Sequence, residues 1–167
     1  ITVYLDENGE AGITTEMIDN GSGDNCSLNS MTLSKYLFKG DNVGDNTVVL
    51  TVVDNFGKTD YCESTVTVFD TIPPLVECVP PFEIQLDENA YYGLTVDMIH
   101  ADSYDECGID TLYLNVYDLN CDYIGKTPVR LTAVDVNGNS SYCETMITVY
   151  GNIPPEALND SAVTIVN

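Results

Sequence analysis

Carboxylates and cysteines are the residues of this chain whose types and spacing could do chemistry. The 167 residues include 27 Asp and Glu, six Cys and one His, against only five Lys and Arg. Many of the acids stand beside Asn, Gly and Ser, in segments where turns are expected. Oxygen ligands of this kind, about six to eight at a time, are what Ca²⁺ takes from proteins. The cysteines indicate disulfides formed in an oxidising compartment.

The chain consists of two tandem copies of one sequence repeat. The pattern of residues 47–69, a strand, a tight turn and a strand, returns 81 positions later in residues 128–150. The offset holds without a gap, and the Ile-Pro-Pro of residues 72–74 matches that of 153–155. A fixed period marks a repeat architecture. We therefore divide the chain into two domains and a remnant: repeat 1 (1–74), repeat 2 (75–155), and 156–167, a linker and the start of a further module.

Short strands separated by turns dominate both repeats. In repeat 1 we expect strands at residues 1–5, 31–38, 47–54 and 59–69, and a strand or short mixed segment at 12–18. Loops fill the intervals, and Gly57 and Gly138 stand where a hairpin turn needs a positive φ. Strands punctuated about every 8–12 residues predict an all-β protein of two tandem immunoglobulin-like β-sandwiches.

Charge excludes several classes of partner. Repeat 1 has 12 acids against three bases and repeat 2 has 13 against two, and the formal net charge is −22. Nucleic acid and anionic membrane are disfavoured, because binding them needs Lys and Arg. No segment approaches the roughly 18 apolar residues of a membrane span. With Ile at position 1 and a strand-like pattern near residue 167, we expect an excised part of a longer extracellular protein.

The cysteines repeat with the same offset, apart from two that occur in repeat 2 alone. Symmetry between the repeats predicts the pairs Cys26–Cys62 and Cys107–Cys143, which leaves Cys78–Cys121 by elimination. A Cys26–Cys62 bridge would close a loop of roughly 37 residues and contribute on the order of 4 kcal/mol. The pairing of Cys78 stays open, because Cys78 and Cys121 fall at opposite ends of the expected sandwich.

The expected strand order gives each sandwich a proximal end, where the chain enters, and a distal end, where it leaves. Head-to-tail stacking brings the distal loops of repeat 1 against the proximal loops of repeat 2. Many carboxylates in one junction repel one another unless a cation lies between them. We therefore predict a Ca²⁺ site there. Its candidate ligands are Asp6, Glu7, Asn8, Asp41, Asp45 and Asp70, facing Asp102, Asp105, Glu106, Asp135 and Asn137.

Simpler interpretations stand beside this one. Asp and Asn are also ordinary turn formers, and no contiguous EF-hand loop occurs. The tyrosines of repeat 2, Tyr91 and Tyr92 above all, could form a sugar-stacking patch or simply serve as strand residues. A zinc site is disfavoured by the absence of Cys-x-x-Cys. The one histidine, His100, has Asp19 as its counterpart and is interpreted as a loop or edge residue. No catalytic motif is found, so we expect no enzyme.

The motifs of both copies resemble a known module. Asp-x-Cys at residues 24–26, Val-Gly-x-Asn-Thr-Val at 43–48, Tyr-Cys at 61–62 and Asp-Thr-x-Pro-Pro at 70–74 resemble hyalin-type immunoglobulin-like repeats. With Leu-Asp-Glu-Asn-Gly at residues 5–9, the chain is similar to repeats of very large secreted adhesins of gliding Bacteroidetes, the SprB type. Repeat 2 departs from the pattern at Pro128 and has Gly151 in place of the counterpart of Asp70, which disfavours a cation at a second junction.

The resemblance implies a segment of a cell-surface filament. Its repeats would act as spacers, with neighbouring repeats of the same chain as partners, and would touch surface polysaccharide or the substratum in attachment or gliding motility. The paired prolines of the linker favour a semi-rigid rod, since proline fixes φ. The alternatives are a carbohydrate-binding module of a secreted protein and a non-catalytic accessory domain of a secreted hydrolase.

Overall fold

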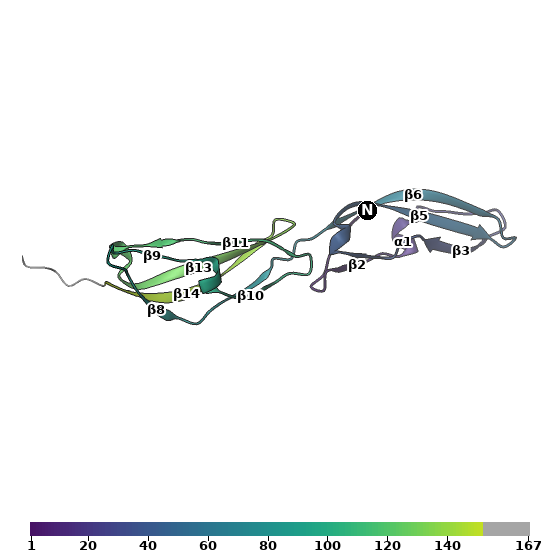
Figure 1. Cartoon of the computed structure of the whole chain (residues 1–167). Coiled ribbons are helices and arrows are strands. Elements are labelled where there is room, and N and C mark those ends of the chain that lie inside the picture. Colours follow the sequence, from purple (N-terminus) through teal and green to yellow (C-terminus); the bar gives the residue numbers. More distant parts are fainter. Residues whose placement is uncertain (152–167) are drawn as a thin grey trace, which may run out of the picture.

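The computed structural model describes residues 1–151, which form two β-sandwich modules arranged end to end (Figure 1). Repeat 1 lies on the right of the view and repeat 2 on the left, with the linker between them. The predicted fold class, tandem immunoglobulin-like sandwiches, is confirmed. The predicted start of a further module at 156–167 and the second Ile-Pro-Pro lie outside the described residues. In the described part, no helix is long and apolar enough to cross a membrane.

Repeat 1 is built on one four-stranded sheet. The sheet has the order β1-β6-β5-β3, in which β1 runs parallel to β6 and the other pairs are antiparallel. A second, smaller sheet pairs β2 with β4. The elements are β1 (Thr2–Tyr4), β2 (Glu10–Gly12), α1 (Thr15–Ile18), β3 (Leu28–Leu33), β4 (Leu37–Lys39), a 3₁₀ turn (Gly40–Asn42), β5 (Gly44–Asp54) and β6 (Thr59–Phe69).

Repeat 2 follows the same plan with one addition. Its main sheet has the order β8-β14-β13-β11, its small sheet pairs β9 with β12, and a further antiparallel pair joins β7 to β10. The elements are β7 (Leu75–Cys78), β8 (Phe82–Gln85), β9 (Tyr92–Gly93), α2 (Val96–Ile99), β10 (His100–Tyr104), β11 (Ile109–Leu114), β12 (Asp118–Leu119), a 3₁₀ turn (Cys121–Tyr123), β13 (Gly125–Asp135) and β14 (Ser140–Tyr150).

Alternation along the long hairpins creates the two cores. In β5, Val48 and Leu50 are buried while their neighbours face outward, and Val66 and Val68 do the same in β6. Successive side chains of a strand point to opposite faces, so one face of each hairpin becomes core. Phe38 from the small sheet is fully buried and closes the core of repeat 1. The matching positions of β13 and β14 form a separate core in repeat 2.

One predicted strand is interrupted. Residues 31–38 do not form a single strand, because the chain leaves the main sheet after Leu33 and joins the small sheet at Leu37. The break is stabilised by the Tyr36 hydroxyl, which accepts a hydrogen bond from the Leu33 backbone N–H at 2.8 Å. In repeat 2, Tyr117 makes the same contact to Leu114 at 3.0 Å. The 12–18 segment takes the mixed form, with a strand ending at Gly12 and one helical turn after it.

The disulfide pairing predicted from repeat symmetry is wrong. The structure joins Cys78 to Cys143, 65 residues apart, and thereby ties β7 to β14. The other four cysteines, at positions 26, 62, 107 and 121, are free thiols. The predicted pairs Cys26–Cys62, Cys107–Cys143 and Cys78–Cys121 are therefore all absent.

Strand register explains the failure. Cys62 lies opposite Leu50, whereas the chain after Cys26 first pairs where Leu28 meets Asp54. Four residues of strand separate the two levels, or about 13 Å, while the Cα atoms of a disulfide lie within about 7 Å. The partner of Cys143 comes from β7, whose counterpart 81 positions earlier would precede Ile1. The true pair could therefore not be found by comparing the two repeats.

Candidate cation site at the junction between the repeats

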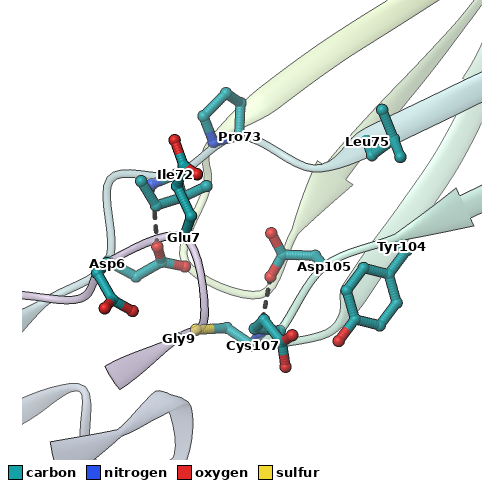
Figure 2. A pocket seen from close by; sticks show the side chains of 11 residues that line it. Asp6, Glu7, Gly9, Ile72, Pro73, Leu75, Tyr104, Asp105 and Cys107 are labelled. Atoms are coloured by element: carbon teal, nitrogen blue, oxygen red, sulfur yellow. Dashed lines mark hydrogen bonds between the residues drawn. The ribbon is translucent and has the colours of Figure 1, made fainter. Parts of the chain in front are cut away.

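A pocket of about 130 Å³ lies where the distal end of repeat 1 meets the proximal end of repeat 2 (Figure 2). Repeat 1 supplies its first turn and the linker, and repeat 2 supplies the loop between β10 and β11. The lining residues are Asp6, Glu7, Gly9, Asp70, Ile72 and Pro73 on one side and Leu75, Tyr104, Asp105, Glu106 and Cys107 on the other. The predicted end-to-end placement of these loops agrees with the structure.

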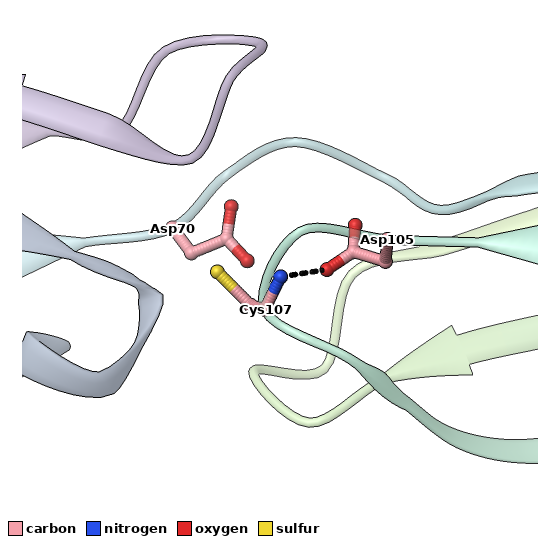
Figure 3. Close-up of side chains that lie close together, drawn as sticks. All are labelled: Asp70, Asp105 and Cys107. Atoms are coloured by element: carbon pink, nitrogen blue, oxygen red, sulfur yellow. Dashed lines mark hydrogen bonds between the residues drawn. The ribbon is translucent and has the colours of Figure 1, made fainter.

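Two carboxylates and a thiol form the centre of the junction. One ligand atom each of Asp70, Asp105 and Cys107 lies within 4.8 Å of the other two. Figure 3 shows the Cys107 sulfur beside the Asp70 carboxylate, with Asp105 on the other side of Cys107. Asp70 follows directly after β6 and is only 8% exposed. The end of a strand therefore places one carboxylate, and the turn before β11 places the other two groups.

Hydrogen bonds fix these side chains from both repeats. The Ile72 N–H donates to one oxygen of Asp70 at 3.0 Å, and the Asn137 side-chain amide donates to the other at 2.8 Å. The Cys107 N–H donates to Asp105 Oδ1 at 2.8 Å. Asp70 is thus held by its own linker and by the β13–β14 turn of the neighbouring repeat, so its position depends on how the repeats stack.

The junction has an excess of negative charge. Burial, followed by the nearby charges of Asp70 and Asp135, raises the pKa of Asp105 above its usual value. Burial and a hydrogen bond to Asp70 raise the pKa of Cys107 to about 12. The ion pairs of the described residues, Lys39 with Glu10 and Arg130 with Glu144, include none of these acids. A positive charge placed here would reduce the repulsion among these carboxylates, which hydrogen-bond donors offset only in part.

The donor set suits a hard cation better than a soft one. Asp70 and Asp105 offer carboxylate oxygens close together, and Asp6 and Glu7 line the same pocket. Oxygen-rich sites of this kind are typical of Ca²⁺. Cys107 offers a single sulfur among these oxygens, and it packs against the core of repeat 1. These residues fit Ca²⁺ through their oxygens, with Cys107 as a packing residue.

The other predicted ligands have different places. Asp135 is 1% exposed and its oxygens accept hydrogen bonds from Asn137 and Asn139 of its own turn. Asn137 contacts the site through Asp70. Four more are exposed and do not line the pocket: Asn8, Asp41, Asp45 and Asp102. The Asn8 N–H donates to Asp6 in its own turn, Asp102 lies within β10 and accepts from the Ser103 N–H, and Asp45 accepts from Thr67.

Sequence reasoning missed the role of Cys107 and of two glycines. Cys107 packs against the core of repeat 1 although it belongs to repeat 2. Gly9 and Gly40 of repeat 1 lie directly against the turn of repeat 2 that carries Glu106 and Cys107. The signal was present in the sequence, since the counterparts of these glycines in repeat 2 are Ala90 and Cys121. A difference at a junction position is informative when the rest of the repeat matches.

The tyrosines of repeat 2 serve mainly in the fold. Tyr92 and Tyr123 pack against the core, and Tyr117 stabilises the strand break. The Tyr91 hydroxyl donates to Asp118 at 2.6 Å, which raises the pKa of Tyr91. Tyr91 and Tyr113 remain exposed. No observation favours sugar stacking over this structural use.

The free thiols should differ in reactivity. Cys26 has the turn position of Cys107 but is exposed. Raising a thiol pKa from 9 to about 12 leaves far less thiolate, although the remaining thiolate is more nucleophilic. The net effect is a rate roughly 30- to 60-fold lower at constant pH. Alkylation followed by mass spectrometry should find Cys107 modified that much more slowly in the folded protein than after denaturation, and more slowly than the exposed Cys26. Equal rates in the folded protein would contradict the half-buried, hydrogen-bonded position of Cys107.

No protein-family model matches this chain. Among solved structures, it is similar to fibronectin(III)-like modules of Clostridium thermocellum CbhA, with 14% identity, a TM-score of 0.37 and coverage of 78% of this chain and 83% of that one. It is also similar to the extracellular cadherin domains 1–4 of Protocadherin Gamma B7, with 16% identity, a TM-score of 0.36 and coverage of 75% of this chain and 42% of that one. The similarity to human mucin-like protocadherin EC1-2 has 11% identity, a TM-score of 0.34 and coverage of 90% of this chain and 96% of that one. These are distant similarities to β-sandwich domains, and they assign no family.

Proposed function

We propose that this chain is a non-catalytic spacer segment of a large extracellular surface protein, in which repeats stack end to end into a stiff rod. The observation that carries the proposal is the way repeat 2 holds the linker. Side chains of its β13–β14 turn and of β14 donate hydrogen bonds to residues on the far side of the junction. A linker fixed in this way sets the angle between the two modules.

Three such bonds act together. Asn137 donates to the Asp70 carboxylate at 2.8 Å, Asn139 donates to the Asp70 carbonyl oxygen at 3.3 Å, and Ser141 donates to the carbonyl oxygen of Pro74. In repeat 1 the matching residues are Phe56, Lys58 and Asp60, so the three donors are a feature of repeat 2. The bond to the Asp70 carboxylate contributes about 1.5–3 kcal/mol, and each of the two bonds to neutral carbonyl oxygens contributes about 0.5–1.5 kcal/mol.

Direct packing supports the same conclusion. Gly9 is buried against Glu106, and Cys107 fills a space at the edge of the repeat 1 core. The two prolines of the linker fix φ between the end of β6 and the start of β7. β7 is itself anchored by the Cys78–Cys143 disulfide. From Asp70 to Cys78 the chain is therefore tied down by bonds, packing or restricted dihedrals.

Calcium and an outside location complete the proposal. Ca²⁺ would bind through Asp70 and Asp105, with Asp6 and Glu7 within the same pocket, and would hold the acidic junction closed. The disulfide and the net charge of −22 suit a secreted or cell-surface protein. The resemblance of the motifs to hyalin-type repeats of gliding adhesins supports a role in attachment or gliding motility. Surface polysaccharide or the substratum would then be the external partner.

Replacing Asn137 with alanine tests the rod. The backbone N–H of Asn137 still donates to Asp135, so the turn should keep its shape while Asp70 loses one hydrogen-bond donor. We expect both modules to stay folded and their relative orientation to broaden. Residual dipolar couplings of the whole chain measure this, because a rigid pair shares one alignment tensor. In the variant the two tensors should diverge.

Phe56→Ala is the matched control, since Phe56 is the repeat 1 counterpart and is 77% exposed. It should leave the shared tensor unchanged. If the unmodified chain already shows two independent tensors, in EDTA and in Ca²⁺ alike, the modules are flexibly tethered and the spacer proposal is wrong. Small-angle scattering on the same samples would then show a broad distribution of lengths instead of a single extended shape.

A further inference from the structure

The tightest packing across the junction involves glycine at position 40. A Cβ placed on Gly40 would lie 2.8 Å from the Cys107 sulfur and 3.3 Å from the Cys107 Cβ. Non-bonded atoms do not approach this closely, so any side chain at position 40 must either push the facing turn away or form a bond to it. Glycine avoids the conflict at this junction and leaves Cys107 as a free thiol.

Repeat 2 has a side chain at the matching position, and it is a cysteine. Gly40 opens the 3₁₀ turn Gly40–Asn42, and Cys121 opens the equivalent turn Cys121–Tyr123 at the distal end of repeat 2. Cys121 is an exposed, free thiol. A module stacked there as repeat 2 is stacked on repeat 1 would bring its own Asp-x-Cys turn against Cys121.

That turn is a fixed feature of the module. In repeat 1 the Cys26 N–H donates to Asp24 Oδ1 at 2.7 Å, and in repeat 2 the Cys107 N–H donates to Asp105 Oδ1 at 2.8 Å. Both copies therefore present the cysteine from the same kind of turn at the proximal end. The turn cysteine can therefore pack against the preceding module whether that module has a glycine or a cysteine at the facing position.

We propose that Cys121 forms a disulfide with the turn cysteine of a further module of this kind stacked on the distal end of repeat 2. The inference rests on the end-to-end stacking proposed above. In a disulfide, the Cβ of one cysteine lies two bonds from the partner sulfur, at about 3 Å, and the Cβ atoms lie about 3.5–4.5 Å apart. The approaches of the Gly40 Cβ to the Cys107 sulfur and Cβ are within a few tenths of an ångström of both values, and its 3.1 Å approach to the Cys107 Cα requires the two turns to move slightly apart.

A second difference at the distal end agrees with this. The counterpart of Asp70 is Gly151, so the carboxylate that hydrogen-bonds Cys107 at the first junction is missing at the next one. Where the first junction offers carboxylates for a cation, the next offers two sulfurs. The two junctions would then be stiffened by different chemistry.

The bond requires an oxidant, which we take to be a disulfide compound of low molecular weight or a disulfide-bearing protein. One cysteine thiolate attacks the oxidant, releases one thiol and forms a mixed disulfide. The second thiolate displaces the other thiol and completes the Cys–Cys bond. Two electrons and two protons pass from the cysteines to the two released thiols, so the exchange balances.

Gly40→Cys tests the geometry in the chain as it exists. The parent has four free cysteines, so the variant exposes five thiols without the new bond and three with it. After incubation with oxidised glutathione and denaturing alkylation, we expect three cysteines that carry either the label or glutathione, and a peptide that joins position 40 to Cys107. Gly12→Cys is the control, because a Cβ there meets only the Tyr36 carbonyl oxygen at 3.9 Å, and it should keep five.

Thermal unfolding checks that the variant folds. Reduced Gly40→Cys and Gly40→Ser should unfold below the parent because their side chains crowd Cys107, whereas the oxidised cysteine variant should unfold above its reduced form. If the oxidised variant keeps five thiols while circular dichroism shows the parent fold, positions 40 and 107 cannot be bridged and the inference is overturned.

The partner itself is tested by adding a module. Residues 1–155 followed directly by a second copy of 75–155 keep the 81-residue period and place a turn cysteine opposite Cys121. Oxidation should protect Cys121 and the added turn cysteine from alkylation, and Cys121→Ser should return the turn cysteine to full labelling. Full labelling of both in the unsubstituted, folded protein would sink the proposal.

Failure of the spacer proposal would look different. If dipolar couplings show independent modules but the cysteine of Gly40→Cys still bonds to Cys107, the junction contact forms without making the pair of modules rigid. The spacer proposal then fails and the disulfide geometry stands. If the modules share one tensor but neither cysteine test yields a bond, the rod stands and Cys121 has no role in joining it. The two readouts therefore separate the disulfide from the function on which it builds.

Discussion

Replacing Cys143 with serine is expected to lower the free energy of unfolding of repeat 2 by about 4 kcal/mol. The Cys78–Cys143 bond closes a loop with a sequence separation of 65 residues. Without it the unfolded chain regains the freedom that the loop removes. The native state loses as well, because both cysteines pack against the repeat 2 core.

The loss of stability should come from the Cys78–Cys143 disulfide alone. Cys78→Ser and the double variant should cost about as much as Cys143→Ser, since each removes the same link. Cys62→Ser is the matched control: Cys62 has the position of Cys143 in repeat 1 but is exposed and unpaired. It should change stability by less than about 0.5 kcal/mol. Urea unfolding followed by circular dichroism, with the repeats resolved by tryptic protection, gives the comparison. Equal losses for Cys62→Ser and Cys143→Ser would contradict the pairing.

The contrast between these two cysteines shows which features the sequence could predict. The fold followed from local information, because the alternation of Val48, Leu50, Val66 and Val68 fixes both the hairpin and its buried face. A disulfide depends instead on which strands lie side by side. The two bonded cysteines are 65 residues apart in the chain, and repeat 1 contains no counterpart of β7 that could reveal the pair.

The junction was predicted in outline for the same reason. Loops at one end of a sandwich can be assigned from strand order, so Asp6, Asp70 and Asp105 were expected to meet. Which acids turn inward depends on side-chain geometry. Asp41 belongs to the expected loop but is exposed, and Asp102 lies in strand β10 where a loop was expected. Cys107, predicted to be half of a disulfide, lies between the carboxylates instead. Periodicity assigns a residue to a loop and does not set the direction of its side chain.

Calcium should stabilise the chain through Asp105 and not through acids in general. With Ca²⁺ at 100 times its dissociation constant, one site adds about 2.7 kcal/mol, which raises the unfolding midpoint by several degrees for a chain of this size. Asp105→Asn should lose most of that rise. Asp24→Asn should keep it, because Asp24 has the same turn in repeat 1, where no linker or neighbouring repeat faces it in this chain.

Without calcium, in EDTA, we expect Asp105→Asn to have the opposite effect on stability. The pKa of Asp105 is raised by burial and by Asp70 and Asp135, so its ionised form is disfavoured in the folded protein. The stability linked to this carboxyl is full below its unfolded pKa, near 3.9, and is lost as the pH rises through the folded pKa. At neutral pH without calcium, an uncharged asparagine therefore relieves repulsion, and Asp105→Asn should be as stable as the parent or more stable.

Lowering the pH should weaken the stabilisation by calcium. A ligating carboxylate must be deprotonated, so the Ca²⁺-induced rise in midpoint should shrink as the pH falls toward the raised pKa of Asp105. Thermal unfolding across pH, in EDTA and in Ca²⁺, separates the two effects. A calcium rise of equal size in the parent, Asp24→Asn and Asp105→Asn would mean that the ion screens the chain generally. The acids of the junction would then be buried turn residues, with stiffness left to the linker bonds and the prolines.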